Sequence, residues 1–324
     1  MAEPAPGFDA IQRRKRLRPI STGKRISPQP RDLLWFRKIH EHGPLPSSYL
    51  HGFSAGEYIN EKRARERLTD LFNEAETRHG GTYLSRPLQQ FRTIDSRYNQ
   101  LVYDLTQASV AALKETGLHS PYATRPSGPW LHGFMTACIT ASIELATLAR
   151  EDLKFIPGWR VLERAGAQLR FPTPIEDPKS GKTVSRDLIP DALFGLEYLT
   201  DAGPRYRFFL VEADRGTEPM TTSNWNRKSW QRSLAQYRAY VGGGLYRDHL
   251  KLTAPVIVLV VGTDERKIAR MLKVADIAGA HAPWLLFTTI GDFGPVFRPP
   301  APMLHLLDES WLGNGVDAFR IDQP

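Results

Sequence analysis

The chain has 324 residues, of which 41% are hydrophobic and 24% are charged, and its formal net charge is +8. This length suits one large domain or two ordinary ones, and the composition is that of a globular protein. A single cysteine, Cys138, excludes a disulfide framework. The sequence shows neither a run long enough to span a bilayer nor a secretory signal, so we expect a cytoplasmic protein.

The positive charge is concentrated at the N-terminus. Residues 1–31 hold eight Lys/Arg and only two Asp/Glu, and this segment is rich in proline and poor in apolar residues. Such a segment buries too little surface to order itself, so we expect residues 1–30 to form a basic disordered arm. Its cluster Arg13, Arg14, Lys15 and Arg16 is of the kind that contacts nucleic acid phosphates, and a merely solubilising tail is the alternative.

Residues 31–117 are predicted to form a winged helix-turn-helix domain. Apolar spacing predicts a helix that ends near Gly43, a short helix in "PSSYLHGF" and a third helix in "INEKRARERLTDLFNEAE". We expect "RHGGTYLSRP" to form a tight hairpin, followed by a strand at 101–103 and a helix that ends at Gly117. In a winged helix the third helix enters the major groove of duplex DNA. The residues expected to contact DNA there are Lys62, Arg63, Arg65 and Arg67, although a basic helix can also be simply a solvated face.

The Pro/Ser/Gly-rich stretch "LHSPYATRPSGP" predicts a domain boundary, after which residues 128–324 should form an α/β domain. A long apolar helix opens this domain in "WLHGFMTACITASIELATLARED". Strands are expected in "VLERAGAQLRF", "LIPDALFGLEYL", "YRFFLVEADR", "APVIVLVVG" and "WLLFTTIG". Helices are expected in "SNWNRKSWQRSLAQYRAYV" and "TDERKIARMLKVADIAG". This order of elements predicts a mixed sheet covered by helices.

Two carboxylates, Glu212 and Asp214, end an otherwise apolar predicted strand. Side chains alternate along a strand, so both should point to the same side of the sheet. If the chain makes a hairpin near 201–203, Asp191 lies about opposite residue 213, in a register that can shift by two. Three carboxylates would then meet, and an all-oxygen cluster of this kind favours Mg²⁺ or Mn²⁺. The alternative is that these acids are solvated or paired with nearby arginines such as Arg215.

"PD" at 190–191, followed by a hairpin and "VEAD", resembles the PD-(D/E)xK nuclease superfamily. The resemblance implies that Asp191 and Glu212 are its metal-binding acids, with Glu144 of the preceding helix as a further ligand. The family lysine position holds Asp214, so Lys228 in the next helix is the candidate for a migrated lysine. Gln236 and Tyr240 in "QYRAY" look like the Gln-x-x-x-Tyr element of the exonuclease branch. The implied catalytic set is Asp191, Glu212, Asp214, Lys228 and Gln236, and the implied metal ligands are Asp191, Glu212, Asp214 and Glu144.

A longer series of motifs resembles the replication-relaxation proteins of plasmids and integrative elements. It comprises the N-terminal winged helix, "NQLVYDLT", "WLHGFMTACI", "IPDALFGL", "FFLVEADRGTEP" and a lysine-containing helix that ends in tyrosine, in order over about residues 30–290. The resemblance implies a DNA-binding protein of replication or mobilisation with a nuclease-like domain. The expected partner is double-stranded DNA, with a relaxase, replication proteins or a second copy of the chain as further candidates, and no membrane.

Two functions stay open from the sequence. One is a Mg²⁺- or Mn²⁺-dependent DNA endonuclease or nickase, in which Lys228 orients water or offsets phosphate charge. The other is a non-catalytic DNA-binding accessory factor or transcriptional regulator that uses a degenerate nuclease fold as a platform. The intact acids favour the first function, and Asp214 at the family lysine position favours the second.

Overall fold

The structure is a computed structural model and describes residues 16–56, 60–92, 99–123, 125, 128–177, 180–221, 225–277, 282–291, 293, 297–314 and 318–324. The chain forms two compact units, which we call unit 1 (Met1–Ser120 with Pro295–Pro302) and unit 2 (Pro121–Gly294 with Met303–Pro324). The division falls within the expected boundary stretch. The return of a late segment to unit 1 was not expected. In the described parts of the chain, no helix is long and apolar enough to cross a membrane.

Unit 1 combines short helices with a small antiparallel sheet. Its elements are α1 (Pro30–His42), β1 (Leu45–Pro46), α2 (Ser47–Phe53), α3 (Glu61–Asn73), β2 (Leu84–Ser85), the 3₁₀ helix η1 (Leu88–Phe91), β3 (Val102–Leu105) and α4 (Gln107–Glu115). The central strand is β3, which is antiparallel to β1 on one side and to β2 on the other. The four helices expected from the sequence in this region are confirmed.

Two expectations for unit 1 are wrong in detail. Gly80 and Gly81, both with positive φ, form the turn between α3 and β2, not the turn of a hairpin. The strands that pair are β2 and β3, joined by the longer connection 86–101. The described part of the expected disordered arm is also bound to the unit. Ile26 is buried, and Ser21 and Thr22 donate hydrogen bonds to the Glu74 carboxylate.

Unit 2 is built around a six-stranded mixed sheet. Its elements are α5 (Trp130–Thr147), β4 (Leu153–Pro157), α6 (Gly158–Ala165), β5 (Phe171–Glu176), β6 (Thr183–Leu188), β7 (Ala192–Thr200), β8 (Gly203–Asp214), α7 (Trp230–Tyr237), the π-helical η3 (Arg238–Gly242), α8 (Tyr246–Leu250), β9 (Val256–Gly262), α9 (Glu265–Ile277), β10 (Ala282–Thr289), α10 (His305–Asp308) and β11 (Leu312–Asn314). The strand order is β11-β10-β9-β8-β7-β4, and β5 pairs with β6 in a separate hairpin. Strands β8, β9 and β10 are parallel, and the other neighbours in the six-stranded sheet are antiparallel.

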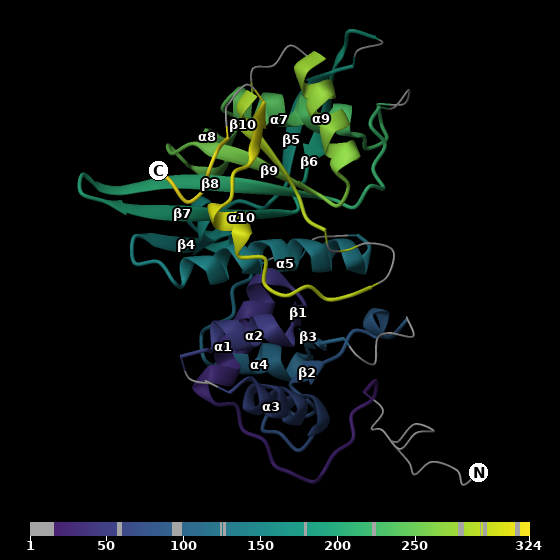
Figure 1. The fold of residues 1–324 in the computed structure, drawn as a ribbon, viewed down its shortest axis with the longest axis vertical. Coiled ribbons are helices and arrows are strands. Elements are labelled where there is room, and N and C mark those ends of the chain that lie inside the picture. The colour runs from purple at the N-terminus through teal and green to yellow at the C-terminus, as the bar shows by residue number, and fades with distance from the viewer. Residues whose placement is uncertain are drawn as a thin grey trace. The chain divides into compact units, whose positions relative to one another are not determined.

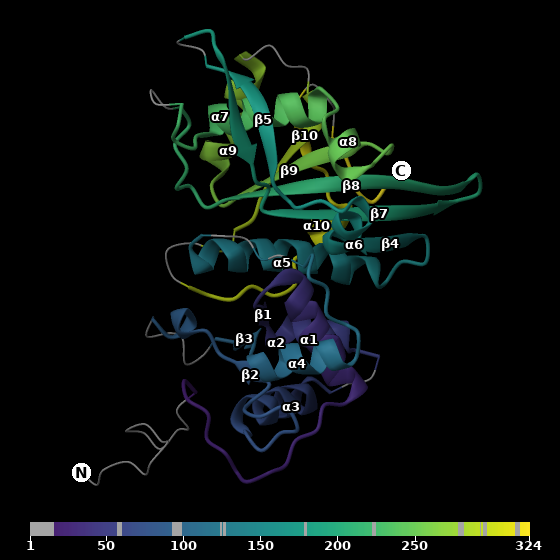
Figure 2. The same ribbon diagram turned by 180° about the vertical axis from the view of Figure 1, so that it is seen from behind.

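Helices cover both faces of this sheet. Figures 1 and 2 show α5 against one face and α7, α8 and α9 on the other. The strand residues alternate accordingly. Phe208 and Leu210 belong to the core that α7 and α9 complete, whereas the intervening Phe209 is buried on the α5 side. All seven residues of β9 are buried, as expected for a strand covered on both faces.

One expected strand of unit 2 is a helix. Residues 161–171 were predicted as a strand, but α6 runs to Ala165 and ends at Gly166, whose φ of 63° is the left-handed conformation that closes a helix. The strand β5 begins only at Phe171. The helix has eight residues, too few for the 3.6-residue apolar period to separate it from a strand. The other expected strands and helices of unit 2 are confirmed.

Candidate functional site

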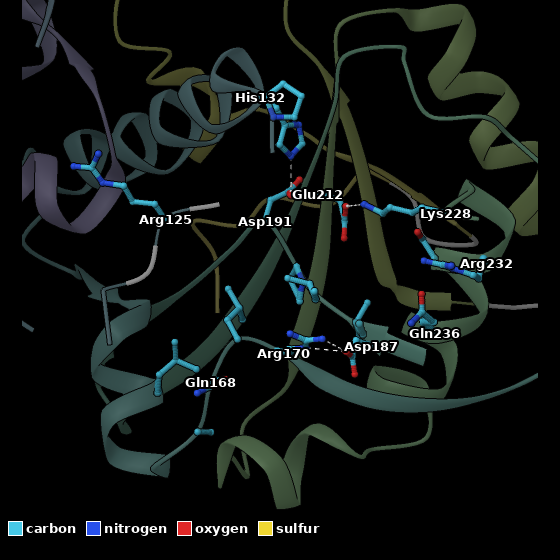
Figure 3. Close-up of a pocket in the computed structure, with 18 of the residues that line it drawn as sticks. Arg125, His132, Gln168, Arg170, Asp187, Asp191, Glu212, Lys228, Arg232 and Gln236 are labelled. Carbon is cyan, nitrogen blue, oxygen red and sulfur yellow. Dashed lines mark hydrogen bonds and ion pairs between the residues drawn. The ribbon is translucent and has the colours of Figure 1, made fainter. Parts of the chain in front are cut away.

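A cavity of about 990 Å³ opens in unit 2 (Figure 3). Its walls come from the first turn of α5, the loop between α6 and β5, the turn between β6 and β7, the end of β8 and the first turns of α7. Asp191, Glu212, Lys228 and Gln236 all line it. Four of the five residues expected in the catalytic set therefore lie around one space.

Asp191 lies directly before β7 and is fixed from both sides. Its backbone N–H donates to the Val211 carbonyl, and its Oδ2 accepts a hydrogen bond of 2.8 Å from the Ala213 N–H. Its Oδ1 lies 2.8 Å from Nε2 of His132, which comes from the first turn of α5. The Asp191 carboxylate is thus held in one orientation at the edge of the cavity.

The register of β7 and β8 places Asp191 beside Glu212. Thr200 pairs with Gly203 and Ala192 pairs with Val211, so the position opposite Asp191 is residue 212 rather than the expected 213. Opposed residues share a face of the sheet, which brings the two carboxylates to the same side. Each of these two side chains is only 10% exposed.

Glu212 is bonded through both of its oxygens. Tyr237 of α7 donates its hydroxyl to Oε1, and the Lys228 ammonium lies 3.4 Å from Oε2. Lys228 also lies 3.3 Å from Oε2 of Glu218 and is 47% exposed. A single lysine is therefore shared between two carboxylates and can balance the charge of only one of them.

Burial and these charges shift the pKa values of the site. Burial raises the pKa of Glu212 to about 7, and Asp191 adds to the rise although Lys228 opposes it. The Glu212 charge raises the pKa of Lys228, so Lys228 stays protonated at neutral pH. The hydrogen bond to Asp191 raises the pKa of His132. Burial raises the pKa of Tyr237 well above its usual range, so Tyr237 is a donor and not a base.

Asp214 does not join the other acids. Its oxygens lie 2.9 Å and 2.7 Å from the ammonium of Lys267 in α9, and Lys267 also donates to the Glu218 carbonyl. Both side chains of this pair are nearly buried, at 11% and 8% exposure. Asp214 is absent from the residues that line the cavity. The structure thus brings together two carboxylates, not the three expected.

Glu144 and Gln236 are placed differently from what the resemblance implied. Glu144 lies on α5 twelve positions after His132, which is about 18 Å along the helix axis. It is therefore far from Asp191, which His132 contacts. Gln236 does line the cavity, but its amide donates to the Arg186 carbonyl of β6. The tyrosine that reaches the acids is Tyr237, whereas Tyr240 bonds His249.

The family model for replication-relaxation proteins matches residues 36–256. The chain belongs to this family. The match covers more than half of the chain and includes His132, Asp191, Glu212 and Lys228, whereas Lys267 lies beyond its end. No curated protein and no solved structure matches the chain.

The two carboxylates of this replication-relaxation protein fit a hard divalent cation. Asp191 and Glu212 offer oxygens only, which is the donor set that Mg²⁺ and Mn²⁺ prefer. Each oxygen that already accepts one hydrogen bond keeps a second lone pair for a ligand. The raised pKa of Glu212 shows that Lys228 leaves its charge incompletely balanced, so a cation at this position would stabilise the ionised form.

Several residues of the site were missed from the sequence. His132 was not expected in the site, although it lies within the motif "WLHGFMTACI". Tyr237 is next to Gln236, and its position seven residues after Trp230 puts both on the buried face of α7. The pairing of Lys267 with Asp214 could not be predicted, because no sequence pattern near Lys267 indicates a partner 53 positions away.

Arg215, the alternative partner named for the acids, does not pair with them. In the described parts of the chain, Arg215 forms no ion pair with Asp191, Glu212 or Asp214. Arg215 lines the cavity instead, together with Arg170 and Arg232. The carboxylates of Asp191, Glu212 and Asp214 are thus paired with lysines and a histidine, whereas the arginines line the cavity.

The basic residues of unit 1 separate into two groups. Lys62, Arg63 and Arg65 are exposed on α3, and Arg65 lies 3.9 Å from Glu61. Arg67 instead makes a two-pronged contact with the buried Asp32, with Nη2 at 2.6 Å, and so stabilises unit 1. Arg16 donates to the Asn99 carbonyl. Arg13, Arg14 and Lys15 lie outside the described residues.

Proposed function

We propose that this replication-relaxation protein binds DNA through unit 1 and hydrolyses DNA phosphodiester bonds at the cavity of unit 2, with Mg²⁺ or Mn²⁺. The observation that carries the proposal is the meeting of three residues in one cavity: Asp191 from the turn before β7, Glu212 from β8, and Lys228 from the loop before α7 rather than from the helix itself. Membership of the family indicates a role in plasmid or mobile-element replication, where such an activity has a substrate.

Asp191 and Glu212 would hold the cation, which when bound activates a water molecule and offsets charge on the phosphate. Lys228 acts as a fixed positive charge, because its raised pKa keeps it protonated. It therefore orients the phosphate and stabilises developing charge rather than removing a proton. The hydrogen bond to Asp191 raises the pKa of His132, which favours the protonated ring that donates to this carboxylate and holds it in place.

The arrangement of unit 1 supports a winged helix-turn-helix. Three helices, a three-stranded antiparallel sheet and a long β2–β3 connection occur in the order of that motif. In this proposal α3 enters the major groove and presents Lys62, Arg63 and Arg65, whereas Arg67 does not contact DNA.

The test is cleavage of supercoiled plasmid and of short duplex and single-stranded DNA, with and without Mg²⁺ or Mn²⁺. Asp191→Asn, Glu212→Gln and Lys228→Met should each reduce the rate at least about 100-fold and leave duplex binding unchanged. Glu197→Gln and Lys154→Met are matched controls outside the cavity and should cleave like the wild type.

One observation favours a non-catalytic accessory factor as the second candidate. The residue two positions after Glu212 is Asp214, which Lys267 neutralises within unit 2. Wild-type protein that binds duplex DNA in a salt-dependent way but cleaves none of the substrates would establish this second function and reject the first.

A further inference from the structure

The cavity is lined by two chemically different groups of residues. Asp191, Glu212 and Lys228 supply charged groups, and a second set supplies an apolar wall. This apolar wall is formed by Tyr122, Leu162, Leu169, Leu188 and Ile189. Figure 3 shows the acids near His132 and the loop that carries Gln168 and Arg170 on the far side of the space.

Within the apolar wall, the side chain of Ile189 is exposed to the cavity space or solvent to an extent that is unusual for a large apolar residue. It is 45% exposed, although its neighbour Leu188 is buried in the core at 3%. Ile189 precedes Asp191 by two positions, so the apolar wall begins directly beside the acids. Tyr122 and Leu169 pack partly against the core and so extend the wall from a fixed base. An apolar surface next to a charged site is expected where a ligand has both kinds of group.

Two arginines that line the cavity have polar atoms without a partner. The Nε atoms of Arg215 and Arg232 are buried and make no hydrogen bond within the described residues. Burial lowers the pKa of Arg232, and the charge of Arg186 adds to the fall although Glu218 opposes it. Buried donors without partners are costly, and phosphate oxygens are well-matched acceptors for a guanidinium group.

We propose that this cavity binds an unpaired nucleotide of a DNA strand, with its base on the apolar wall and its phosphate toward Asp191, Glu212 and Lys228. Arg215 and Arg232 then bind the flanking phosphates. The proposal rests on the proposed function and names its substrate: the protein cuts unpaired or frayed DNA in preference to an intact duplex.

The cavity volume and the burial of its two carboxylates argue against a base-paired nucleotide at the apolar wall. A cavity of about 990 Å³ is at the upper end for small-molecule pockets, which run from about 300 to 1,000 Å³. It holds a nucleotide or a few nucleotides, but not a duplex. Both carboxylate side chains are only 10% exposed, so the phosphate must enter the cavity. In a duplex the faces of a base are covered by stacking, and only an unpaired base offers a face to Ile189 and Tyr122.

The experiment measures binding of a fluorescein-labelled tetrathymidylate and of the same tetranucleotide without bases, by fluorescence anisotropy. The full chain is used in Ca²⁺, and a gel confirms that the probe stays intact. The probe is too short to form a duplex, and Arg63→Ala should leave its affinity unchanged. The probe with bases should bind at least about tenfold more tightly than the abasic probe. Ile189→Ala should reduce this ratio, whereas Leu199→Ala, at a similarly exposed residue outside the cavity, should not.

Cleavage in Mg²⁺ of a single-stranded oligonucleotide, a duplex with an unpaired end and a blunt duplex separates the two proposals. Faster cleavage of the first two, together with base-dependent binding, supports the inference. Equal cleavage of all three with equal affinity for both probes overturns the inference and leaves the proposed function standing. No metal-dependent cleavage of any substrate rejects the proposed function, and the substrate assigned here with it.

Discussion

Tyr237 donates its hydroxyl to Oε1 of Glu212, while Oε2 of the same carboxylate faces the Lys228 ammonium at 3.4 Å. Both contacts favour the ionised acid and oppose the effect of burial, which raises the pKa of Glu212 to about 7. Burial and the neighbouring acids thus raise the pKa of Glu212, while Lys228 and Tyr237 oppose the rise, and the removal of any one of these influences should move its titration.

Tyr237→Phe should raise the pKa of Glu212 further, because the lost donor stabilised the charged form. A hydrogen bond to a charged group contributes about 1.5–3 kcal/mol, which corresponds to about one to two pH units. The pH at which Mg²⁺ begins to raise the melting temperature should move upward by this amount. Differential scanning fluorimetry across the pH range measures it. Tyr240→Phe is the control, since Tyr240 bonds His249 instead, and an unchanged profile in Tyr237→Phe would contradict the prediction.

Glu212→Gln should stabilise the metal-free protein above neutral pH. The folded-state pKa of Glu212 is above its unfolded value of 4.5, so the folded state binds more protons than the unfolded state between about 4.5 and about 7. The stability of the wild type therefore falls as pH rises through this window, by about 3 kcal/mol from this group.

Glu212→Gln has no carboxyl group to titrate, so its stability should not fall with pH for this reason. Its melting temperature should exceed that of the wild type at about pH 8 and be similar at about pH 4.5. His132 has a raised pKa and contributes a loss of the same sign at higher pH, which both proteins share. Thermal unfolding in EDTA at several pH values measures the difference. A variant less stable than the wild type at the higher pH would show that Lys228 and Tyr237 outweigh burial.

Lys267→Met should destabilise unit 2 strongly, because it leaves Asp214 buried without a counter-charge. The loss of one partner of a buried pair costs about 3–5 kcal/mol. The double variant Asp214→Asn with Lys267→Met should recover most of this loss and cleave DNA like the wild type, since the pair is outside the cavity. Urea unfolding and the plasmid assay measure the two effects. A stable double variant without cleavage would return Asp214 to the catalytic set.

Arg63 and Arg67 lie four residues apart on α3, but their replacement should affect different properties. Arg63→Ala should weaken DNA binding, and Arg67→Ala should lower stability. Arg63 is exposed, so its removal should weaken duplex binding and reduce the salt dependence by about one phosphate contact, without loss of stability. Arg67 pairs with Asp32, which is fully buried, so its removal should lower the free energy of unfolding by about 3–5 kcal/mol. Titration at several salt concentrations and urea unfolding give both values. Similar effects of the two changes would reject the assignment of Arg67 to the unit 1 interior.

Local sequence patterns could place Asp191 beside Glu212, whereas Lys228 was expected in the site only from the resemblance to the nuclease superfamily. Alternation along β8 fixed the face of Glu212, and the two-residue turn before Gly203 set the register that puts Asp191 opposite it. The expected register was wrong by one residue, because an apolar run does not mark where its turn begins. A similar lack of information led to the expected strand at α6, because this helix is too short to show the 3.6-residue apolar period.

Contacts between distant segments could not be predicted in this way. His132 reaches Asp191 across 59 positions, and Lys267 reaches Asp214 across 53. Strand alternation indicates that Asp214 shares a face with Glu212, but only the position of α9 decides that a lysine covers it. A shared face is thus not a shared site, which is why three acids were expected and two were found.

The return of Pro295–Pro302 to unit 1 has a consequence for how the protein is made. Tyr49 donates to the Ala301 carbonyl, and Gln100 donates to the Pro300 carbonyl 200 positions later in the chain. At about 5–20 residues per second, a ribosome needs about 10–40 s to supply those acceptors after Gln100 has emerged. These two hydrogen bonds of unit 1 therefore form only after nearly all of unit 2 has been translated. Unit 1 of the nascent chain is completed only when unit 2 is almost finished.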